Sequence, residues 1–193
     1  MGYLEFIIYG IIQGLTEFVP VSSTAHLKII SIVLGIPDPG ASLSAIIQLG
    51  SVMALFWYFR NYIVKFKSKS VKTYFDFLFH EKLFRSILIG TIPIVLLGGS
   101  IKLLIPYFFD KFLRSNLSIA LVSILVAIFM YIADSSKKGS INLENHNYRD
   151  SFLIGISQAL AIFPGFSRSG VTISTALISG WERGDAVKFS FLL

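Results

Sequence analysis

The sequence predicts an all-α polytopic membrane protein with an inverted-topology repeat and two re-entrant helix–loop–helix hairpins. Three observations lead to this fold class. First, 54% of the 193 residues are hydrophobic and only 15% are charged, whereas soluble domains carry about 25% charged residues. Second, a segment near the N-terminus returns 145 positions later. Third, two apolar segments are each interrupted near the middle by Pro, Gly and Ser.

The internal repeat is visible without a gap. Residues 10–23 read GIIQGLTEFVPVSS, and residues 155–168 read GISQALAIFPGFSR. A duplicated apolar unit that is broken by such residues indicates a site between two repeats of a membrane protein. The coinciding pairs are Gly10/Gly155, Ile11/Ile156, Gln13/Gln158, Leu15/Leu160, Phe18/Phe163 and Ser22/Ser167.

Uninterrupted and interrupted apolar segments predict different elements. A spanning helix needs about 20 apolar residues, which residues 43–59, 86–104 and 117–133 provide. Residues 3–35 and 152–180 are interrupted by PVSS at 20–23 and by PGFSRSG at 164–170. Irregular backbone is tolerated at membrane depth only where protein or a wet cavity satisfies it. We therefore expect each of these two segments to form a re-entrant hairpin.

The distribution of Lys and Arg predicts the orientation. The segment after the first span holds Arg60, Lys65, Lys67, Lys69, Lys72, Lys82 and Arg85. The loop richest in Lys and Arg is predicted to be cytoplasmic, which also places the loop at 134–150 in the cytoplasm. The hairpin at 3–35 then enters from the outside, and the hairpin at 152–180 enters from the cytoplasm. We expect one membrane domain over 1–193, with repeat one at 1–133, a loop at 134–150 and the start of repeat two at 151–193. Residues 71–84 are predicted to form an amphipathic interfacial segment.

The interruptions also carry the polar chemistry. Half-helices should begin near Ser23 and Ser169, with N-termini that point toward the midplane and attract anions. Arg168 adds a guanidinium suited to bidentate phosphate contact. Glu17 and His26 are able to move protons. An anion cradle with a hydroxyl, a base and a cationic clamp is typical of phosphoryl transfer.

Each polar residue also has a structural interpretation. Arg168 could snorkel to the interface, and Glu17 could end its half-helix. Ser22, Ser23 and Thr24 could serve as helix caps. Other polar residues are expected to form hydrogen bonds between helices or to lie on the surface. The interhelical group is Gln13, Gln158, Gln48 and Ser51, and the surface group is His80 and His146.

Two motifs carry a family resemblance. EFVPVSSTAH at 17–26 and PGFSRSGVT at 164–172 resemble the two signatures of bacterial undecaprenyl-diphosphate phosphatases of the integral-membrane, bacitracin-resistance type. The likeness extends to IQLGS at 47–51 and SFLL at 190–193. It implies hydrolysis of undecaprenyl diphosphate to the monophosphate, which recycles the lipid carrier of peptidoglycan synthesis. It also implies a multi-pass protein of the bacterial cytoplasmic membrane, with a pocket open to the extracytoplasmic side.

The resemblance assigns roles to residues. Ser23 is similar to the proposed nucleophile, Glu17 to its acid/base partner and Arg168 to the phosphate clamp. His26 is similar to a second group that handles protons or contacts phosphate. These four are the predicted catalytic residues. The predicted substrate contacts are Ser22, Thr24, Ser167, Ser169, Gly170 and Thr172.

The resemblance further implies a divalent cation, Mg²⁺ or Ca²⁺, with Glu17 and Gln13 as its candidate ligands. Family members often carry Glu where this chain has Gln13, and a hard cation prefers several oxygen ligands. The family also continues beyond position 193, so the chain is expected to be C-terminally incomplete. The expected partners are a polyprenyl diphosphate lipid, the bilayer and, as an open question, a second copy in a homodimer.

Other functions fit the sequence less well than hydrolysis does. An inverted-repeat transporter or flippase for a polyprenyl phosphate lipid fits the same architecture, but it has no use for a nucleophile beside a base. Soluble-fold acid phosphatases that act on lipid phosphates have a His six positions after the Arg of a Ser-Arg signature, and the position six after Arg168 in this chain is Ser174. A scaffold would not tolerate these polar groups at membrane depth. The basic loops indicate topology, so no nucleic-acid partner is expected.

Overall fold

A computed structural model describes residues 2–60, 81–104, 115–136 and 139–193. In these residues every regular element is a helix, and the only strand-like pairing is an isolated bridge between Ile141 and Trp181. The helices are α1 (Tyr3–Phe18), α2 (Ser23–Leu34), α3 (Gly40–Tyr58), α6 (Lys82–Leu104), α8 (Asn116–Asp134), α9 (Tyr148–Leu160), α10 (Arg168–Ile178) and α11 (Arg183–Leu192).

The sequence repeat is matched by a repeat of helix boundaries. α1 begins at Tyr3 and α9 at Tyr148, and α2 and α10 begin at Ser23 and Arg168, so both offsets are 145 positions. Shortly after α2 and α10, Gly35 and Gly180 adopt positive φ angles of 64° and 88°. Glycine adopts this conformation without steric cost. The two helix pairs therefore share one local plan.

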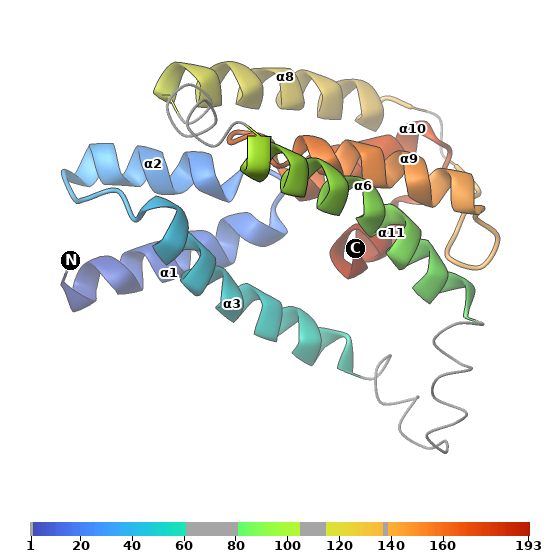
Figure 1. Cartoon of the computed structure of the whole chain (residues 1–193), viewed down its shortest axis with the longest axis horizontal. Coiled ribbons are helices and arrows are strands. Elements are labelled where there is room, and N and C mark those ends of the chain that lie inside the picture. Colours follow the sequence, from blue (N-terminus) through green and yellow to red (C-terminus); the bar gives the residue numbers. More distant parts are fainter. Residues whose placement is uncertain (1, 61–80, 105–114, 137–138) are drawn as a thin grey trace.

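The two helix pairs come from opposite ends of the molecule (Figure 1). The α1–α2 pair opens toward the N-terminal end, the α9–α10 pair opens toward the other end, and their elbows lie near the middle. Residues 19–22 and 161–167 form these elbows and are not helical. The predicted interruptions of both segments are thus confirmed.

The three uninterrupted helices also follow the prediction, since α3, α6 and α8 coincide with the expected spans at 43–59, 86–104 and 117–133 to within four residues at either end. One boundary was wrong. α9 begins inside the expected loop at 134–150, because Asn147 accepts a hydrogen bond from the amide of Asp150, whose carboxylate bonds back to the Asn147 amide. Such a reciprocal cap starts a helix. The segment predicted at 71–84 lies mostly outside the described residues.

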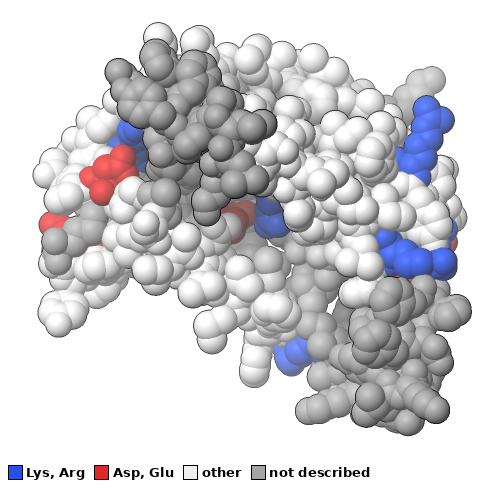
Figure 2. All heavy atoms as spheres, viewed as in Figure 1, with Lys and Arg blue, Asp and Glu red and all other residues white. Residues whose placement is uncertain are grey.

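Apolar side chains cover much of the described surface. α6, over Lys82–Ile101, and α8 are long and apolar enough to cross a membrane. Large apolar residues are exposed along the helices, for example Leu15 at 64% and Leu125 at 63%. Among the described residues in Figure 2, most of the face carries no charged group, and an acidic and a basic group adjoin in the hollow at its middle. Contiguous apolar surface of this kind indicates contact with lipid.

The second hairpin is held by close helix contacts. α9 packs on α6 and α10, and α10 also packs on α8 and α11. At Gly155 an added Cβ would lie 2.3 Å from the Gly90 carbonyl oxygen, so α9 and α6 cross backbone to backbone. The core nearby is formed by Ala133, Ile154, Ala176, Leu177, Trp181, Ala186 and Phe189.

The expectation that His146 is a surface residue was wrong. Its side chain is 1% exposed, and its Nε2 lies 2.7 Å from the Ser86 hydroxyl. Its ring also packs on Trp181 and Phe189. Burial lowers the pKa of His146 below its ordinary value, because the imidazolium loses its hydration, and Lys82 adds repulsion. His146 thus joins the 139–147 segment to α6 as a neutral group.

Candidate active site

The first elbow places a hydroxyl against a carboxylate. Glu17 is in the last turn of α1, and Ser23 is the first residue of α2. The Ser23 hydroxyl donates a hydrogen bond of 3.1 Å to Glu17 Oε2. Gln13 Nε2 donates to the same oxygen at 2.8 Å, and Gln48 Nε2 donates to Oε1 at 2.9 Å. Both oxygens of the Glu17 carboxylate therefore accept a hydrogen bond from a side-chain amide, and Oε2 also accepts one from the Ser23 hydroxyl.

Ser22 shapes this elbow. It is the only non-glycine residue of the described chain with a positive φ, at 62°, a conformation that costs about 1–3 kcal/mol. Its carbonyl oxygen lies 3.0 Å from His26 Nδ1 and also accepts the His26 amide at 3.3 Å. Its own hydroxyl is buried and has no partner among the described residues. The tight reversal into α2 is thus stabilised by the His26 ring.

At the second elbow, the side chain of Ser167 caps the N-terminus of α10. The Ser167 hydroxyl accepts a hydrogen bond of 3.2 Å from the Gly170 amide, which caps α10. Ser169 Oγ lies 3.4 Å from that hydroxyl. Gly165 has a φ of 100°, and a Cβ there would lie 2.8 Å from the Ile119 carbonyl oxygen. A larger residue at that position would push the elbow away from α8.

The two elbows enclose one polar cavity of about 210 Å³. It brings together the expected base, nucleophile and clamp: Glu17, Ser23 and Arg168. Two half-helices begin at this cavity, α2 at Ser23 and α10 at Arg168, so their free amides and positive dipole ends favour an anion there. The remaining lining residues are Thr16, Ser22, Thr24, Gln48, Ile94, Ala161, Phe166, Ser167 and Ser169.

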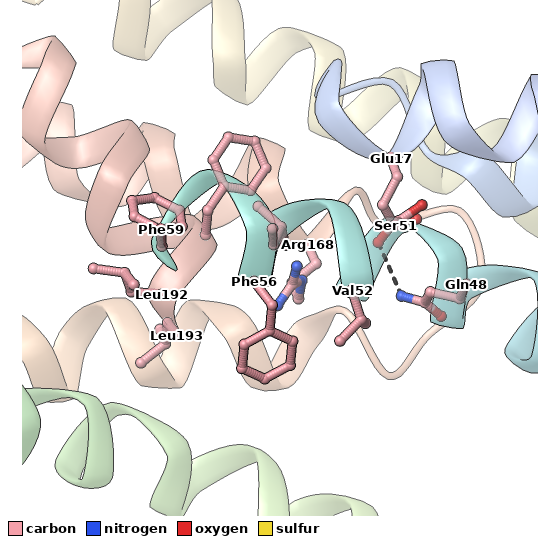
Figure 3. Close-up of a pocket in the computed structure, with 11 residues that line it drawn as sticks. Glu17, Gln48, Ser51, Val52, Phe56, Phe59, Arg168, Leu192 and Leu193 are labelled. Carbon is pink, nitrogen blue, oxygen red and sulfur yellow. Dashed lines mark hydrogen bonds between the residues drawn. The ribbon is translucent and has the colours of Figure 1, made fainter. Parts of the chain in front are cut away.

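An apolar groove of about 330 Å³ continues from this cavity. Glu17, Gln48 and Arg168 line both spaces. In Figure 3 the Arg168 guanidinium lies beside Phe56 of α3, and the hydrogen bond from Gln48 to Glu17 marks the polar end of the groove. Its other lining residues are Ser51, Val52, Leu55, Phe59, Phe191, Leu192 and Leu193. The polar cavity therefore opens into an apolar groove.

Four of the predicted site residues are not among those that line the polar cavity. Gln13 donates a hydrogen bond to Glu17, and His26 Nδ1 lies within hydrogen-bond distance of the Ser22 carbonyl oxygen. Gly170 donates its amide to Ser167. The Thr172 hydroxyl lies 2.6 Å from Ser190 Oγ, which joins α10 to α11. The contacts of Gln13, His26 and Gly170 therefore lie at the elbows, and that of Thr172 lies between two helices.

The contact between Gln48 and Glu17 was not predicted from the sequence. Gln48 was expected to form a hydrogen bond between helices, and it does so, but its acceptor is the predicted base. The available signal was an amide in the run Ile46–Leu49 of an otherwise apolar helix, where a polar side chain is costly without a partner. Nothing in the spacing identified Glu17 as that partner.

The oxygen donors of the cavity suit a cation that arrives with phosphate. Glu17 is the only carboxylate that lines it, with hydroxyls around it, and no cluster of three acidic, His or Cys residues exists in the described part of the chain. Mg²⁺ is commonly bound by one or two carboxylates together with substrate phosphate oxygens. The residues present therefore fit a shared cation better than an enclosed protein site.

Comparison with known proteins identifies the family. A family model described as bacitracin resistance protein BacA matches residues 6–193. The chain belongs to this family. The resemblance seen in the two sequence motifs is thereby confirmed, and with the apolar helices it makes this a membrane protein.

Three similar proteins carry the name undecaprenyl-diphosphatase. The undecaprenyl-diphosphatase of Prochlorococcus marinus strain MIT 9301 is 74% identical over 193 residues, which is 100% of this chain and 73% of the relative. The protein of that name from strain AS9601 is 73% identical, again over 100% of this chain and 70% of its own length. The one from Trichodesmium erythraeum is 45% identical over 98% of this chain and 62% of its own length.

Proposed function

We propose that this chain hydrolyses undecaprenyl diphosphate to undecaprenyl phosphate and inorganic phosphate, the activity that its relatives' name states. The observation that supports it most is the Ser23 hydroxyl bonded to Glu17 in a cavity that Arg168 also lines. A nucleophile beside a base, with a cation for phosphate, is the arrangement that phosphoryl transfer needs. The product would re-enter peptidoglycan synthesis as the lipid carrier.

In the first step Glu17 Oε2 takes the proton of the Ser23 hydroxyl. The Ser23 oxygen attacks the terminal phosphorus, and the bond from that phosphorus to the bridging oxygen breaks. The bridging oxygen leaves with the electron pair as part of the lipid monophosphate. The products of this step are a phosphoserine and a protonated Glu17.

In the second step water attacks the phosphoserine phosphorus. The bond from phosphorus to the Ser23 oxygen breaks, and Glu17 returns its proton to that oxygen. Both protons of the water stay with the departing phosphate, so the residues regain their starting state. Arg168 and the amides that begin α2 and α10 balance the charge on the phosphoryl oxygens, and such preorganised donors are a large part of catalysis.

Glu17 and the hydroxyls beside it would hold a divalent cation, Mg²⁺ or Ca²⁺, which would neutralise phosphate charge. Gln13 as a further ligand stays a prediction, since its amide nitrogen is the atom that faces Glu17. The roles of Ser22, Thr24, Ser167 and Ser169 as phosphate contacts are supported by their place in the cavity wall. A proton-transfer role for His26 also stays a prediction.

The finer topology is part of this proposal. The opposed helix pairs in Figure 1 support two re-entrant hairpins of an inverted repeat in the bacterial cytoplasmic membrane. With the basic loops inside, the open end of α1–α2 faces the extracytoplasmic side, and the substrate enters there. The apolar groove would then hold the first isoprene units of the substrate. The transporter alternative is not favoured by the relatives' name.

The proposal is tested with purified full chain in detergent micelles, without any ion gradient. Phosphate release from undecaprenyl diphosphate is measured with Mg²⁺ and with a chelator, and the lipid product is identified as the monophosphate. Multiple turnover is expected with Mg²⁺. Binding of the lipid with no release of phosphate under both conditions would contradict hydrolysis and favour a carrier.

A further inference from the structure

Gln48 makes a contact that no other described part of α3 makes. It lies near the middle of that helix, and its amide nitrogen is 2.9 Å from Glu17 Oε1, on a residue 31 positions earlier. Gln13, which donates to Oε2, is on the same helix as Glu17 and moves with it. Among the described donors to this carboxylate, Gln48 is the one that lies outside the α1–α2 pair.

We infer that Gln48 is a positioning residue, which holds the Glu17 carboxylate so that Oε2 stays directed at the Ser23 hydroxyl. This inference rests on the proposed hydrolysis. A carboxylate can rotate about its terminal torsion, which has a broad energy well. With Oε1 bound by Gln48, rotation breaks a charge-assisted hydrogen bond, and such bonds are about twice as strong as neutral ones.

The location of Gln48 explains why this anchor matters. Gln48 and Glu17 line both the polar cavity and the apolar groove, so a lipid that moves through the groove passes this pair (Figure 3). Without the amide, Oε1 would face the groove mouth with no described donor. The carboxylate would then turn toward another donor, such as Arg168 across the cavity, and would leave Ser23 without its base.

The side chain of Gln48 does not itself exchange protons, which sets the expected kinetics. Gln48→Met keeps the length of the side chain and removes the donor. We expect kcat to fall about 10- to 100-fold, the equivalent of one charge-assisted hydrogen bond, and KM to stay within about twofold. Gln48→Asn keeps the amide but is one methylene shorter, so kcat is expected to fall in this variant as well. It provides a second test should the methionine variant fold poorly.

The matched control is Ser44→Ala, one turn earlier on α3. The Ser44 hydroxyl donates only to the Gly40 carbonyl of its own helix, and Ser44 is not among the residues that line either space. We expect kcat and thermal stability near those of the wild type. An equal fall in kcat for Ser44→Ala would overturn the inference, because it would mean that any change in α3 disturbs turnover.

A double-mutant cycle with Glu17→Gln distinguishes positioning from helix packing. If Gln48 acts through the carboxylate, Gln48→Met has less than about a twofold effect on the residual rate of Glu17→Gln, since neighbours that act as a unit are not additive. If Gln48→Met lowered the residual rate of Glu17→Gln by the same factor of about 10 to 100, the inference would be overturned. A change confined to KM would also overturn it. A wild type that releases no phosphate would instead overturn the proposed function, and the inference with it.

Discussion

The Ser23 hydroxyl donates to Glu17 Oε2 at 3.1 Å across the elbow between α1 and α2. The two residues are only six positions apart, yet they belong to different helices that run in opposite directions (Figure 1). The pair exists because the chain reverses within residues 19–22, with Ser22 at a positive φ. The backbone strain at the elbow is therefore coupled to the placement of the proposed nucleophile.

Ser23→Ala removes the hydroxyl that this geometry directs at the phosphorus. We expect kcat to fall on the order of 10³-fold or more, as for loss of a nucleophile in other hydrolases. Phosphate release in detergent is the measurement. Ser31→Ala on the same helix is the control, because that hydroxyl donates only to the Lys28 carbonyl. Near-normal turnover by Ser23→Ala would exclude the phosphoserine and leave direct attack by water.

Gln13→Glu would place a second carboxylate beside Glu17 and remove the amide that now donates to Oε2 at 2.8 Å. Two adjacent carboxylates repel each other, and a hard divalent cation relieves that repulsion. We expect the Mg²⁺ concentration for half-maximal phosphate release to fall about tenfold, and Mg²⁺ to raise the melting temperature of this variant more than that of the wild type.

Gln13→Met is the control that separates the effect of the added carboxylate from the effect of the lost hydrogen bond. It removes the same amide donor but adds no carboxylate, so its Mg²⁺ dependence should remain that of the wild type. A tenfold gain in Mg²⁺ affinity in Gln13→Met would show that the carboxylate pair is not the cause.

The orientation of the hairpins gives a prediction that the chain itself makes easy to test, because it contains no cysteine. Asp38 follows α2 and Glu144 precedes α9, and both are exposed. In intact cells an impermeant maleimide should label Asp38→Cys but not Glu144→Cys, while opened cells should show both labelled. Labelling of both from the outside would contradict the inverted arrangement, and the reverse pattern would invert the proposed orientation.

The parts of this structure that could be predicted from sequence are those set by local composition. Pro20 and Pro164 end apolar segments in both repeats, so the two elbows were predictable, and the length of the apolar runs identified α3, α6 and α8. The contacts of Gln48 and His146 were not. Each lies far along the chain from its partner, Glu17 at 31 positions and Ser86 at 60. Such contacts depend on how the helices pack, and the hydrophobic periodicity of the sequence does not predict that packing.

The buried His146 predicts that acid destabilises the fold. Its folded-state pKa lies below the ordinary value of about 6.5 because of burial. The unfolded chain therefore binds the proton more readily, and stability is lost as the pH falls below about 6.5. Each pH unit in that window costs up to about 1.4 kcal/mol, until the folded-state pKa is reached.

Melting temperatures in detergent between pH 7.5 and 5.5 measure this effect. His146→Gln keeps a polar partner for Ser86 and cannot titrate, so its melting temperature should depend less on pH than that of the wild type. The same acid-side slope in both proteins would assign the loss to another group.

The two repeats offer a matched pair of glycine substitutions, at equivalent positions with different surroundings. At Gly155 a Cβ would lie 2.3 Å from the Gly90 carbonyl oxygen, whereas at Gly10 it would meet nothing within 4 Å. Gly155→Ala must therefore separate α9 from α6, with a cost of at least about 1–3 kcal/mol from overpacking. Gly10→Ala should stabilise α1 by about 0.5–1 kcal/mol, since alanine favours the helix.

Melting temperature and phosphate release distinguish these two outcomes. Gly155→Ala should lower both, because α9 leads directly into the elbow before Arg168, and Gly10→Ala should leave turnover intact. Equal tolerance at the two positions would mean that α6 and α9 do not cross backbone to backbone. The equivalence of the repeats would then extend to their packing, and the functional asymmetry would reside only in the elbows, where Ser23 and Arg168 occupy matching positions.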